Sequence, residues 1–264
     1  MITGMSEIKI KARLFTSADL RAGDPVTPST GQAHYLLKVM RAQDAEHVVL
    51  FNGRDGEWLS SIAAASKKSC QLRIEKQLRP QSPEPDLWLA FAPLKKSNTD
   101  FVIEKATELG VSRLIPVFTE RTNTGRVKCE RLRAIAMEAA EQCDRLSVPE
   151  VSEPLSLAGL IADWPAGRTL LVPDETGGGK PLKSVLETAG ETRSHGFLIG
   201  PEGGFAVSEL DALGNLPFVS KVGLGPRILR AETAALAALA CFQVLAGDWQ
   251  QAPRFNNGYF FNAR

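Results

Sequence analysis

The sequence predicts an α/β protein of two domains, a small β-rich domain followed by a larger domain built on a parallel sheet. From residue 87 onward apolar strands alternate with helical segments, an order typical of a parallel α/β sheet. Before residue 80, short apolar runs are separated instead by turn signals such as Asn52-Gly53 and Asp55-Gly56. A proline-rich stretch divides the two patterns, so we place the domain boundary there.

That stretch, residues 78–86, holds three prolines and no apolar periodicity, a composition typical of an extended, stiff linker. No role is assigned to the C-terminal end of the chain from the sequence. The expected organisation is a leader at residues 1–12, a β-barrel-like domain at residues 13–79, a linker at residues 80–86, an α/β domain at residues 87–249 and a tail at residues 250–264.

The β-rich domain is expected to contain strands at residues 12–15, 47–52, 57–63 and 69–75. A short helix over residues 34–40 is expected to direct inward Leu36, Leu37, Val39 and Met40. Residues 1–82 carry 12 Lys and Arg against 8 Asp and Glu, whereas the whole chain has a net charge of +1. A basic domain favours binding of a polyanion such as RNA. An excess of four positive charges is equally consistent with an ordinary solvated surface, so charge alone does not decide between the two.

The α/β domain is expected to have strands at residues 87–92, 114–118, 169–172, 197–199 and 219–224, with helices at residues 99–109 and 130–143. The last two strands each run into a glycine-proline turn, Gly200-Pro201 and Gly225-Pro226, and a helix follows each turn. Ligands of open α/β sheets bind outside the carboxyl ends of strands, where such turns leave backbone N–H groups free. Two such turns close together in the sequence predict one shared pocket.

The last helix follows the turn segment at residues 225–233, ends near Gly247 and is apolar on nearly all sides. Such a helix is expected to be buried all round, either in the core or against another subunit. Pro173-Asp174-Glu175 follows an earlier strand and is expected at the same edge of the sheet as the two turns. Its acidic side chains would accept ribose hydroxyls there, or else be ordinary loop charges.

Spacing excludes several common kinds of site. The first turn lacks the GxxxxGK[ST] phosphate loop and the dinucleotide fingerprint, and it puts a carboxylate, Glu202, where a phosphate would need cations. The four cysteines and three histidines show no ligand spacing, which predicts no bound metal. No apolar run approaches the roughly 20 residues that span a bilayer, and no signal peptide is visible. We therefore expect a soluble, cytoplasmic protein that does not enter membranes.

Five segments, in order, resemble the motifs of one enzyme family. They are HYLLKVMR at residues 34–41, KKSNTDFVIEKATELGVSRLIPVFTERT at 95–122, EAAEQCDRLSVPE at 138–150, IGPEGGF at 199–205 and LGPRILRAETA at 224–234. GPEGG alone would be weak evidence, whereas the ordered set is specific. The set resembles the RsmE-type methyltransferases of the SPOUT superfamily, which make N3-methyluridine in small-subunit ribosomal RNA.

The resemblance implies a SPOUT-type trefoil-knotted α/β domain with a small N-terminal PUA-like β-barrel domain. It also implies S-adenosyl-L-methionine as methyl donor, 16S rRNA of the 30S subunit as partner, and a homodimer. The donor would lie between the two glycine-proline loops. Matching positions for donor contacts are Pro173, Asp174, Leu198, Ile199, Gly200, Leu224, Gly225, Ile228 and Leu229.

Uracil N3 bears a proton and is a poor nucleophile until the proton leaves, so methylation there needs a base or an anion stabiliser. Glu202 is the carboxylate nearest the predicted pocket, and burial would make it a better base. Arg230 would stabilise negative charge that spreads onto the uracil oxygens. The alternatives are that Glu202 only contacts a helix N-terminus and that Arg230 pairs with Glu232 or with a partner subunit.

Lys and Arg side chains supply the sequence-independent part of RNA affinity, and they are common in the first domain. Two readings other than a methyltransferase stay open. One is a non-catalytic RNA-binding dimeric module, and the other is a dinucleotide-dependent oxidoreductase, which α/β alternation alone would suggest. The candidate RNA-contacting side chains, expected to be exposed, are Arg13, His34, Lys38, Arg41, Arg54, Lys67 and Lys68, and Arg145 matches a family motif position.

Overall fold

The structure is a computed structural model that describes residues 8–66, 69–189, 194–251 and 259–261. The chain divides into two compact units. The N-terminal unit contains the residues up to Pro83 together with Glu141–Ser147 and the last strand, and the α/β unit contains Glu84–Ala140 and Val148–Ala252. The segment Glu141–Ser147 therefore packs with the first unit, although the sequence placed it inside the α/β domain.

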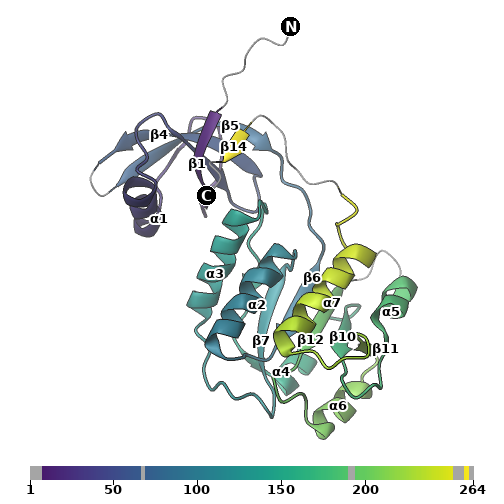
Figure 1. Cartoon of the computed structure of the whole chain (residues 1–264). Helices are drawn as coiled ribbons and strands as arrows, with labels where there is room; N and C mark the ends of the chain where they lie inside the picture. Colours follow the sequence, from purple (N-terminus) through teal and green to yellow (C-terminus); the bar gives the residue numbers. More distant parts are fainter. Residues whose placement is uncertain (1–7, 67–68, 190–193, 252–258, 262–264) are drawn as a thin grey trace. The chain divides into compact units, whose positions relative to one another are not determined.

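The described residues of the N-terminal unit form a sheet in the order β14-β1-β3-β4-β5-β2. Strands β3 and β4 pair antiparallel, as the Asn52-Gly53 and Asp55-Gly56 turn signals between them predicted. Strand β5 pairs antiparallel with β4, whereas β1 lies parallel to β3 and to β14. The strands are β1 (Ile8–Phe15), β2 (Pro25–Val26), β3 (His47–Phe51), β4 (Glu57–Ala65), β5 (Cys70–Arg79) and β14 (Tyr259–Phe261) (Figure 1).

Two expectations for the ends of the chain are wrong. Strand β1 begins at Ile8, inside the stretch expected to be a leader, because Ile10 is buried in a small core with Val49 of β3 and Leu59 of β4. Residues 259–261, expected to belong to a tail without a role, pair with β1 as strand β14. Residues 1–7 lie outside the described residues.

A helix α1 (Thr30–His34) continues into one π-helical turn, η1 (Tyr35–Val39), where the sequence predicted a single short helix. The wider turn is closed by a hydrogen bond that Met40 N donates to Tyr35 O, at 2.9 Å. Leu36 is fully buried, as predicted. Val39 is 60% exposed, so its predicted inward position is wrong, because the wider turn rotates it away from the core.

Buried charges link three strands of the N-terminal unit to the segment Glu141–Ser147. Glu57 accepts hydrogen bonds from Arg13 Nε at 2.6 Å and from Arg79 Nε at 2.7 Å. Arg79 also donates to the Asp144 carbonyl oxygen at 3.1 Å, and the Arg13 guanidinium lies over the Phe51 ring. Burial alone would raise the pKa of the Glu57 carboxyl, but Arg79 and Arg13 outweigh it and hold that pKa below its ordinary value.

Replacing Glu57 by Gln is expected to lower the free energy of unfolding at pH 7 by about 3 kcal/mol, because the buried Arg13 and the half-buried Arg79 lose their main counter-charge. Since the folded pKa of Glu57 is depressed, its stabilising charge is fully present above the ordinary glutamate pKa of about 4.3 and is lost as the pH falls below it. Urea denaturation of both proteins between pH 3 and pH 7 checks this. A difference that stays constant at acid pH would contradict the ion-pair account.

The described residues of the α/β unit form one sheet in the order β11-β13-β10-β12-β6-β7-β8, with β9 also beside β7. Every pairing is parallel, as the alternation of strands and helices predicted. The strands are β6 (Leu87–Phe91), β7 (Arg113–Phe118), β8 (Glu150–Val151), β9 (Leu155–Ser156), β10 (Thr169–Pro173), β11 (Lys180–Pro181), β12 (His195–Ile199) and β13 (Val219–Gly223).

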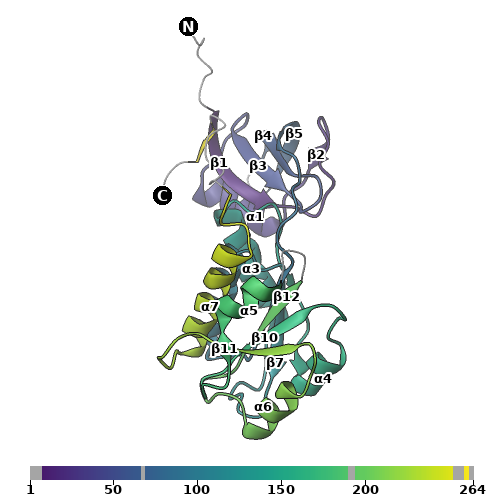
Figure 2. The same ribbon diagram turned by 90° about the vertical axis from the view of Figure 1, so that its right-hand side faces the viewer.

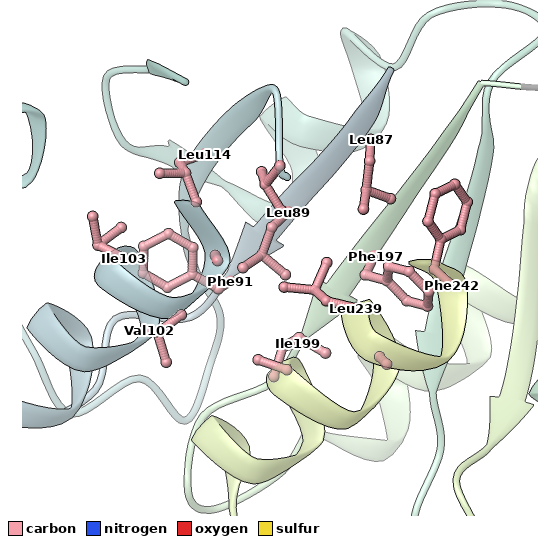
Figure 3. Close-up of a cluster of buried hydrophobic side chains, with 14 of the residues drawn as sticks. Leu87, Leu89, Phe91, Val102, Ile103, Leu114, Phe197, Ile199, Leu239 and Phe242 are labelled. Atoms are coloured by element: carbon pink, nitrogen blue, oxygen red, sulfur yellow. The ribbon is translucent and has the colours of Figure 1, made fainter. Parts of the chain in front are cut away.

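Helices cover both faces of this sheet (Figure 2). Because side chains alternate along a strand, Phe197 and Ile199 of β12 enter the core under α2 and α7, as Figure 3 shows, and α5 packs against the same core. Leu198 enters the core under α4 and α6. The helices are α2 (Lys96–Glu108), α3 (Cys129–Gln142), α4 (Leu157–Ala162), α5 (Leu182–Ala189), α6 (Val207–Gly214) and α7 (Ala231–Leu245).

Helix α7 is buried along one side only in the single chain, so burial all round inside the core is wrong, while the alternative of burial against another subunit stays a prediction. Ala235, Leu239 and Phe242 pack into the sheet core. Val244 and Leu245 on the last turn are 49% and 40% exposed. Across the part of the chain that the structure describes, no helix has the length and apolar character that crossing a membrane requires.

The buried stripe of β12 is expected to carry much of the stability of the α/β unit. Phe197→Ala removes a side chain with no solvent exposure and should lower the free energy of unfolding by about 3–5 kcal/mol, because it loses apolar burial and leaves a cavity. Val207→Ala, at a position 70% exposed, is the control and should change it by less than about 0.5 kcal/mol. Chemical denaturation measures both, and equal losses would contradict this packing.

Candidate active site

Three neighbouring strands bring their carboxyl ends to one edge of the sheet. Strand β10 lies between β12 and β13, and because all three are parallel, Pro173, Ile199 and Gly223 end at the same edge. A cavity of about 1200 Å³ opens there, lined by the loops that follow these strands. Its place is the one that open α/β sheets use for ligands, and the sequence predicted a shared pocket at this point.

The loop after β12, Gly200–Gly204, forms one wall of the cavity. Gly204 has a φ of +66°, a conformation that side-chain-bearing residues rarely adopt, and its N–H donates to Pro201 O at 2.9 Å. Arg121, in the loop after β7, donates to Gly203 O at 3.0 Å. Glu202 points to solvent and is exposed, so the burial expected to strengthen it as a base is wrong.

Glu209 in the first turn of α6 holds two loops together. Its carboxylate accepts hydrogen bonds from the backbone N–H of Ala206, at 2.9 Å, and of Glu120, at 2.8 Å. Ala206 begins helix α6, and Glu120 belongs to the loop after β7. The loop after β12 is therefore held at two points. Arg121 binds the carbonyl oxygen of Gly203, and Glu209 binds the N–H of Ala206, where the loop enters α6.

The loop after β13 forms the facing wall and leads directly into α7. Gly225 has a φ of +101°, and Ile228 is 81% exposed although it lines the cavity. Arg230 is the N-cap residue of α7, and its side chain is exposed at the cavity rim. Among the described residues Arg230 makes no ion pair, so the predicted alternative of a pairing with Glu232 is not found.

Asp174, directly after β10, supplies a buried acidic group at the base of the cavity. It is 8% exposed, and its backbone N–H donates to Val222 O at 2.9 Å. Its Oδ1 accepts from the Thr176 backbone N–H at 2.9 Å and from the Thr176 hydroxyl at 2.6 Å, while Lys221 Nζ lies 4.0 Å from Oδ2. The Asp174 carboxylate is therefore held in a fixed orientation by its own loop and by β13.

The cavity brings together almost all the residues that the sequence singled out for donor and substrate contacts. Leu198 is the exception, because it points to the opposite face of the sheet, under α4 and α6. The predicted residues that line the cavity are Pro173, Asp174, Ile199, Gly200, Glu202, Leu224, Gly225, Ile228, Leu229 and Arg230.

Sequence reasoning missed a second group of lining residues, which come from the loops after β6 and β7 and from α7. Lys95 and Asn98 stand at the start of α2, Asn123 and Thr124 follow β7, and Glu232 lies in the first turn of α7. Their place in the chain could have predicted them, because the loops after β6 and β7 follow parallel strands and therefore lie at the same edge of the sheet as the cavity. Nothing in the local sequence marked these side chains themselves.

Arg13, which was expected to be exposed and to contact RNA, is 5% exposed and bound to Glu57, so the expected exposure is wrong. Arg145, which matches a family motif position, is 8% exposed with Nη2 3.2 Å from Ser147 Oγ, and its contact with RNA stays a prediction. Composition could not indicate these contacts, because Glu57 lies 44 positions from Arg13 and because Arg145 binds Ser147 within a local turn. Of the others, Arg54 is exposed and pairs with Asp19, Lys67 and Lys68 lie outside the described residues, and His34, Lys38 and Arg41 are exposed.

Comparison with known families assigns the chain to a class. Residues 80–243 match an RNA methyltransferase domain, and residues 29–75 match an RNA methyltransferase PUA domain. The first match covers the strands and loops that form the cavity, and the second covers β3, β4 and the first part of β5. The α/β unit is thus an RNA methyltransferase domain. In the described parts of the chain, no cluster of three or more potential metal ligands occurs.

Named relatives narrow the class to one family. Ribosomal RNA small subunit methyltransferase E of Rickettsia conorii is 31% identical over 84% of this chain and 91% of its own, and that of Synechocystis is 33% identical over 83% and 73%. A crystal structure of the Neisseria gonorrhoeae enzyme of this name, bound to S-adenosyl methionine, aligns with a TM-score of 0.82 and 27% identity, over 90% of this chain and 99% of its own. This chain belongs to the ribosomal RNA small subunit methyltransferase E family.

Two adjacent glycines in the first loop provide a matched test of its conformation. Gly204→Ala should lower the free energy of unfolding by about 1–2 kcal/mol, because Ala is strained at φ +66° and its Cβ would lie 2.4 Å from Glu175 Oε1. Gly203→Ala should be nearly neutral, because its Cβ would make only ordinary contacts with Arg121. Urea denaturation separates the two, and a larger loss for Gly203→Ala would contradict this loop geometry.

Proposed function

We propose that this protein transfers the methyl group of S-adenosyl-L-methionine to N3 of a specific uridine in 16S rRNA of the small ribosomal subunit. Membership of the family makes it an S-adenosylmethionine-dependent rRNA methyltransferase. The observation that carries the proposal is the cavity where β10, β12 and β13 end between two glycine-proline loops. The choice of uridine N3 rests on the motif resemblance.

The cavity suits the methyl donor. Its volume of about 1200 Å³ holds a nucleoside-sized ligand with space beside it for a base. Asp174 presents a fixed, buried carboxylate that suits a ribose hydroxyl or the donor's ammonium group. Leu224 and Leu229 provide apolar contacts. Glu175 and Glu202 add negative charge to the lining, which disfavours a polyphosphate and agrees with a donor that carries a positive sulfonium and no phosphate.

The chemistry requires that charge be stabilised when N3 loses its proton. As the proton leaves, negative charge spreads onto the two uracil carbonyl oxygens. The guanidinium of Arg230 stands at the rim of the cavity, at the start of α7, without an ion-pair partner among the described residues. It supplies a positive charge and up to five N–H donors to those oxygens. The donor, when bound, supplies the electrophilic methyl group.

The proposal includes the assembly and location that the resemblance implies. The two glycine-proline loops form the crossings of a trefoil knot, and the sheet of the N-terminal unit closes into a PUA-like barrel. A homodimer covers the exposed apolar end of α7, where Val244 and Leu245 lie. His34, Lys38 and Arg41, exposed on the N-terminal unit, contact rRNA phosphates in the cytoplasm.

The test of this function uses small ribosomal subunits purified from cells that lack the modification. Incubation with methyl-labelled S-adenosylmethionine should yield label that is recovered, after nuclease digestion, as N3-methyluridine. Label recovered as another nucleoside would contradict the target assignment. Tight rRNA binding with no transfer would favour a non-catalytic RNA-binding module.

Arg230→Ala should lower kcat by about 100-fold or more, because it removes a charge that acts in the transition state. The dissociation constant for S-adenosylmethionine, measured by calorimetry, should change little, since the donor contacts come mainly from other residues. Lys183→Ala, which removes an exposed lysine from α5, is the charge-matched control and should retain normal turnover. Arg230 has no direct role if its variant turns over normally.

A further inference from the structure

Glu232, in the first turn of α7, presents an incompletely satisfied carboxylate beside the cavity. It lines the cavity, and its Oε1 accepts a hydrogen bond from Asn98 Nδ2 of α2 at 3.3 Å. Its Oε2 is buried and has no hydrogen-bond partner among the described residues. Two side chains 134 positions apart in the sequence thus present an amide and a carboxylate to the same cavity.

A buried carboxylate oxygen without a donor raises the free energy of the protein, because it has lost its hydrogen bonds to water and has formed no hydrogen bond within the protein. The cost is removed when a ligand in the cavity brings an N–H group. Glu232 is held at one oxygen only, and the last torsion of a glutamate side chain is soft, so the carboxylate can turn toward such a donor. Asn98 keeps a second N–H of its amide for the same ligand.

The other acidic groups of the cavity are less suited to receive a proton from a base. Glu202 and Glu175 are exposed to solvent. Asp174 is buried, but its Oδ1 already accepts two hydrogen bonds from Thr176 and its Oδ2 lies near Lys221. Glu232 is the acidic lining residue with a buried and unpartnered oxygen, and it is two residues from Arg230.

We propose that Asn98 and Glu232 together recognise the Watson–Crick edge of the target uracil and that Glu232 removes the N3 proton. The inference rests on the proposed function and assigns the base that the reaction needs. Uracil presents one N–H between two carbonyl oxygens. Glu232 accepts the N3–H, Asn98 donates to one flanking oxygen, and Arg230 donates to the other. Donor and acceptor positions thus match along the whole edge.

The same pair rejects cytosine. Cytosine N3 is an acceptor and carries no proton, so it would face the Glu232 carboxylate lone pairs directly. Its exocyclic amino group would face the N–H donor of Asn98 or of Arg230. The buried carboxylate and the donor that faces the amino group would then be left unpaired, while the other donor still binds O2, and such unpaired groups are the physical basis of strong discrimination in sites built for hydrogen bonds.

The methyl transfer balances with these groups. The N3–H bond breaks and its proton passes to the Glu232 carboxylate, while the bonding electron pair stays on N3. N3 then attacks the sulfonium methyl carbon of the donor, a C–N bond forms, and the C–S bond breaks with its electron pair going to sulfur. The products are N3-methyluracil, a neutral thioether and a protonated Glu232, which returns its proton to water after product release.

Glu232→Gln tests the proton transfer with little change of shape, because Gln still accepts the bond from Asn98 but cannot take a proton. At pH 7 we expect kcat to fall about 100-fold or more, while the dissociation constant for S-adenosylmethionine changes less than about 3-fold. Glu187→Gln, on the exposed face of α5, is the matched control and should keep normal turnover.

The pH dependence provides a readout that a structural role would not move. Hydroxide can replace the missing base, so the rate of Glu232→Gln should rise about tenfold per pH unit above pH 7, a slope the unsubstituted protein should not show. The other charged groups that line the cavity are Lys95, Asp174, Glu175, Glu202, Arg227 and Arg230, and all of them are present in both proteins. The ratio of the two rates at each pH therefore isolates Glu232.

Asn98→Ala tests recognition separately and should raise KM for the small subunit about 10-fold by removing one base-edge donor. The proposal is overturned if Glu232→Gln turns over normally, if Glu202→Gln instead shows the loss with the hydroxide-dependent recovery, or if Glu232→Gln loses donor binding together with turnover. If the unsubstituted protein transfers no methyl group to rRNA, the proposed function fails first and this assignment fails with it.

Discussion

Parallel pairing of β10 with β12 on one side and β13 on the other determines where this protein can bind a ligand. Parallel strands end at the same edge of a sheet, so the three loops that follow them must share one space. Backbone N–H groups at these ends are not used by the sheet, and glycines at positive φ, such as Gly204 and Gly225, allow a close approach. The cavity is therefore a consequence of strand order rather than of any single side chain.

Because side chains alternate along the strands, the central strands contribute to the cores on both faces of the sheet. In β12, Phe197 anchors the strand in the core under α7 and Leu198 anchors it in the core on the other face. Ile199, at the end of the strand, packs at the margin shared by the first core and the cavity, since it belongs to both. Helix α7 has a double role. Its buried face holds the sheet, and its first turn carries Arg230 and Glu232 to the cavity. Stability of the core and geometry of the site thus depend on the same elements.

Sequence patterns predicted the parallel sheet, the antiparallel hairpin at Asn52-Gly53 and the meeting of the glycine-proline loops, because each follows from local periodicity or local turn chemistry. They failed where the outcome depends on contacts between distant residues. The sequence predicted Arg13 to be an exposed cation, whereas in the structure it is buried against Glu57 and Asp144. The role of Glu232 was invisible for the same reason, since its environment is created by Asn98 on another helix.

Hydrogen exchange with and without S-adenosylmethionine tests most directly whether the three strand ends form one donor site. If they do, the donor should slow exchange together in the loops at residues 173–176, 200–205 and 224–230, because one ligand contacts all three. Protection in only one of these loops, or protection confined to the N-terminal unit, would contradict the account.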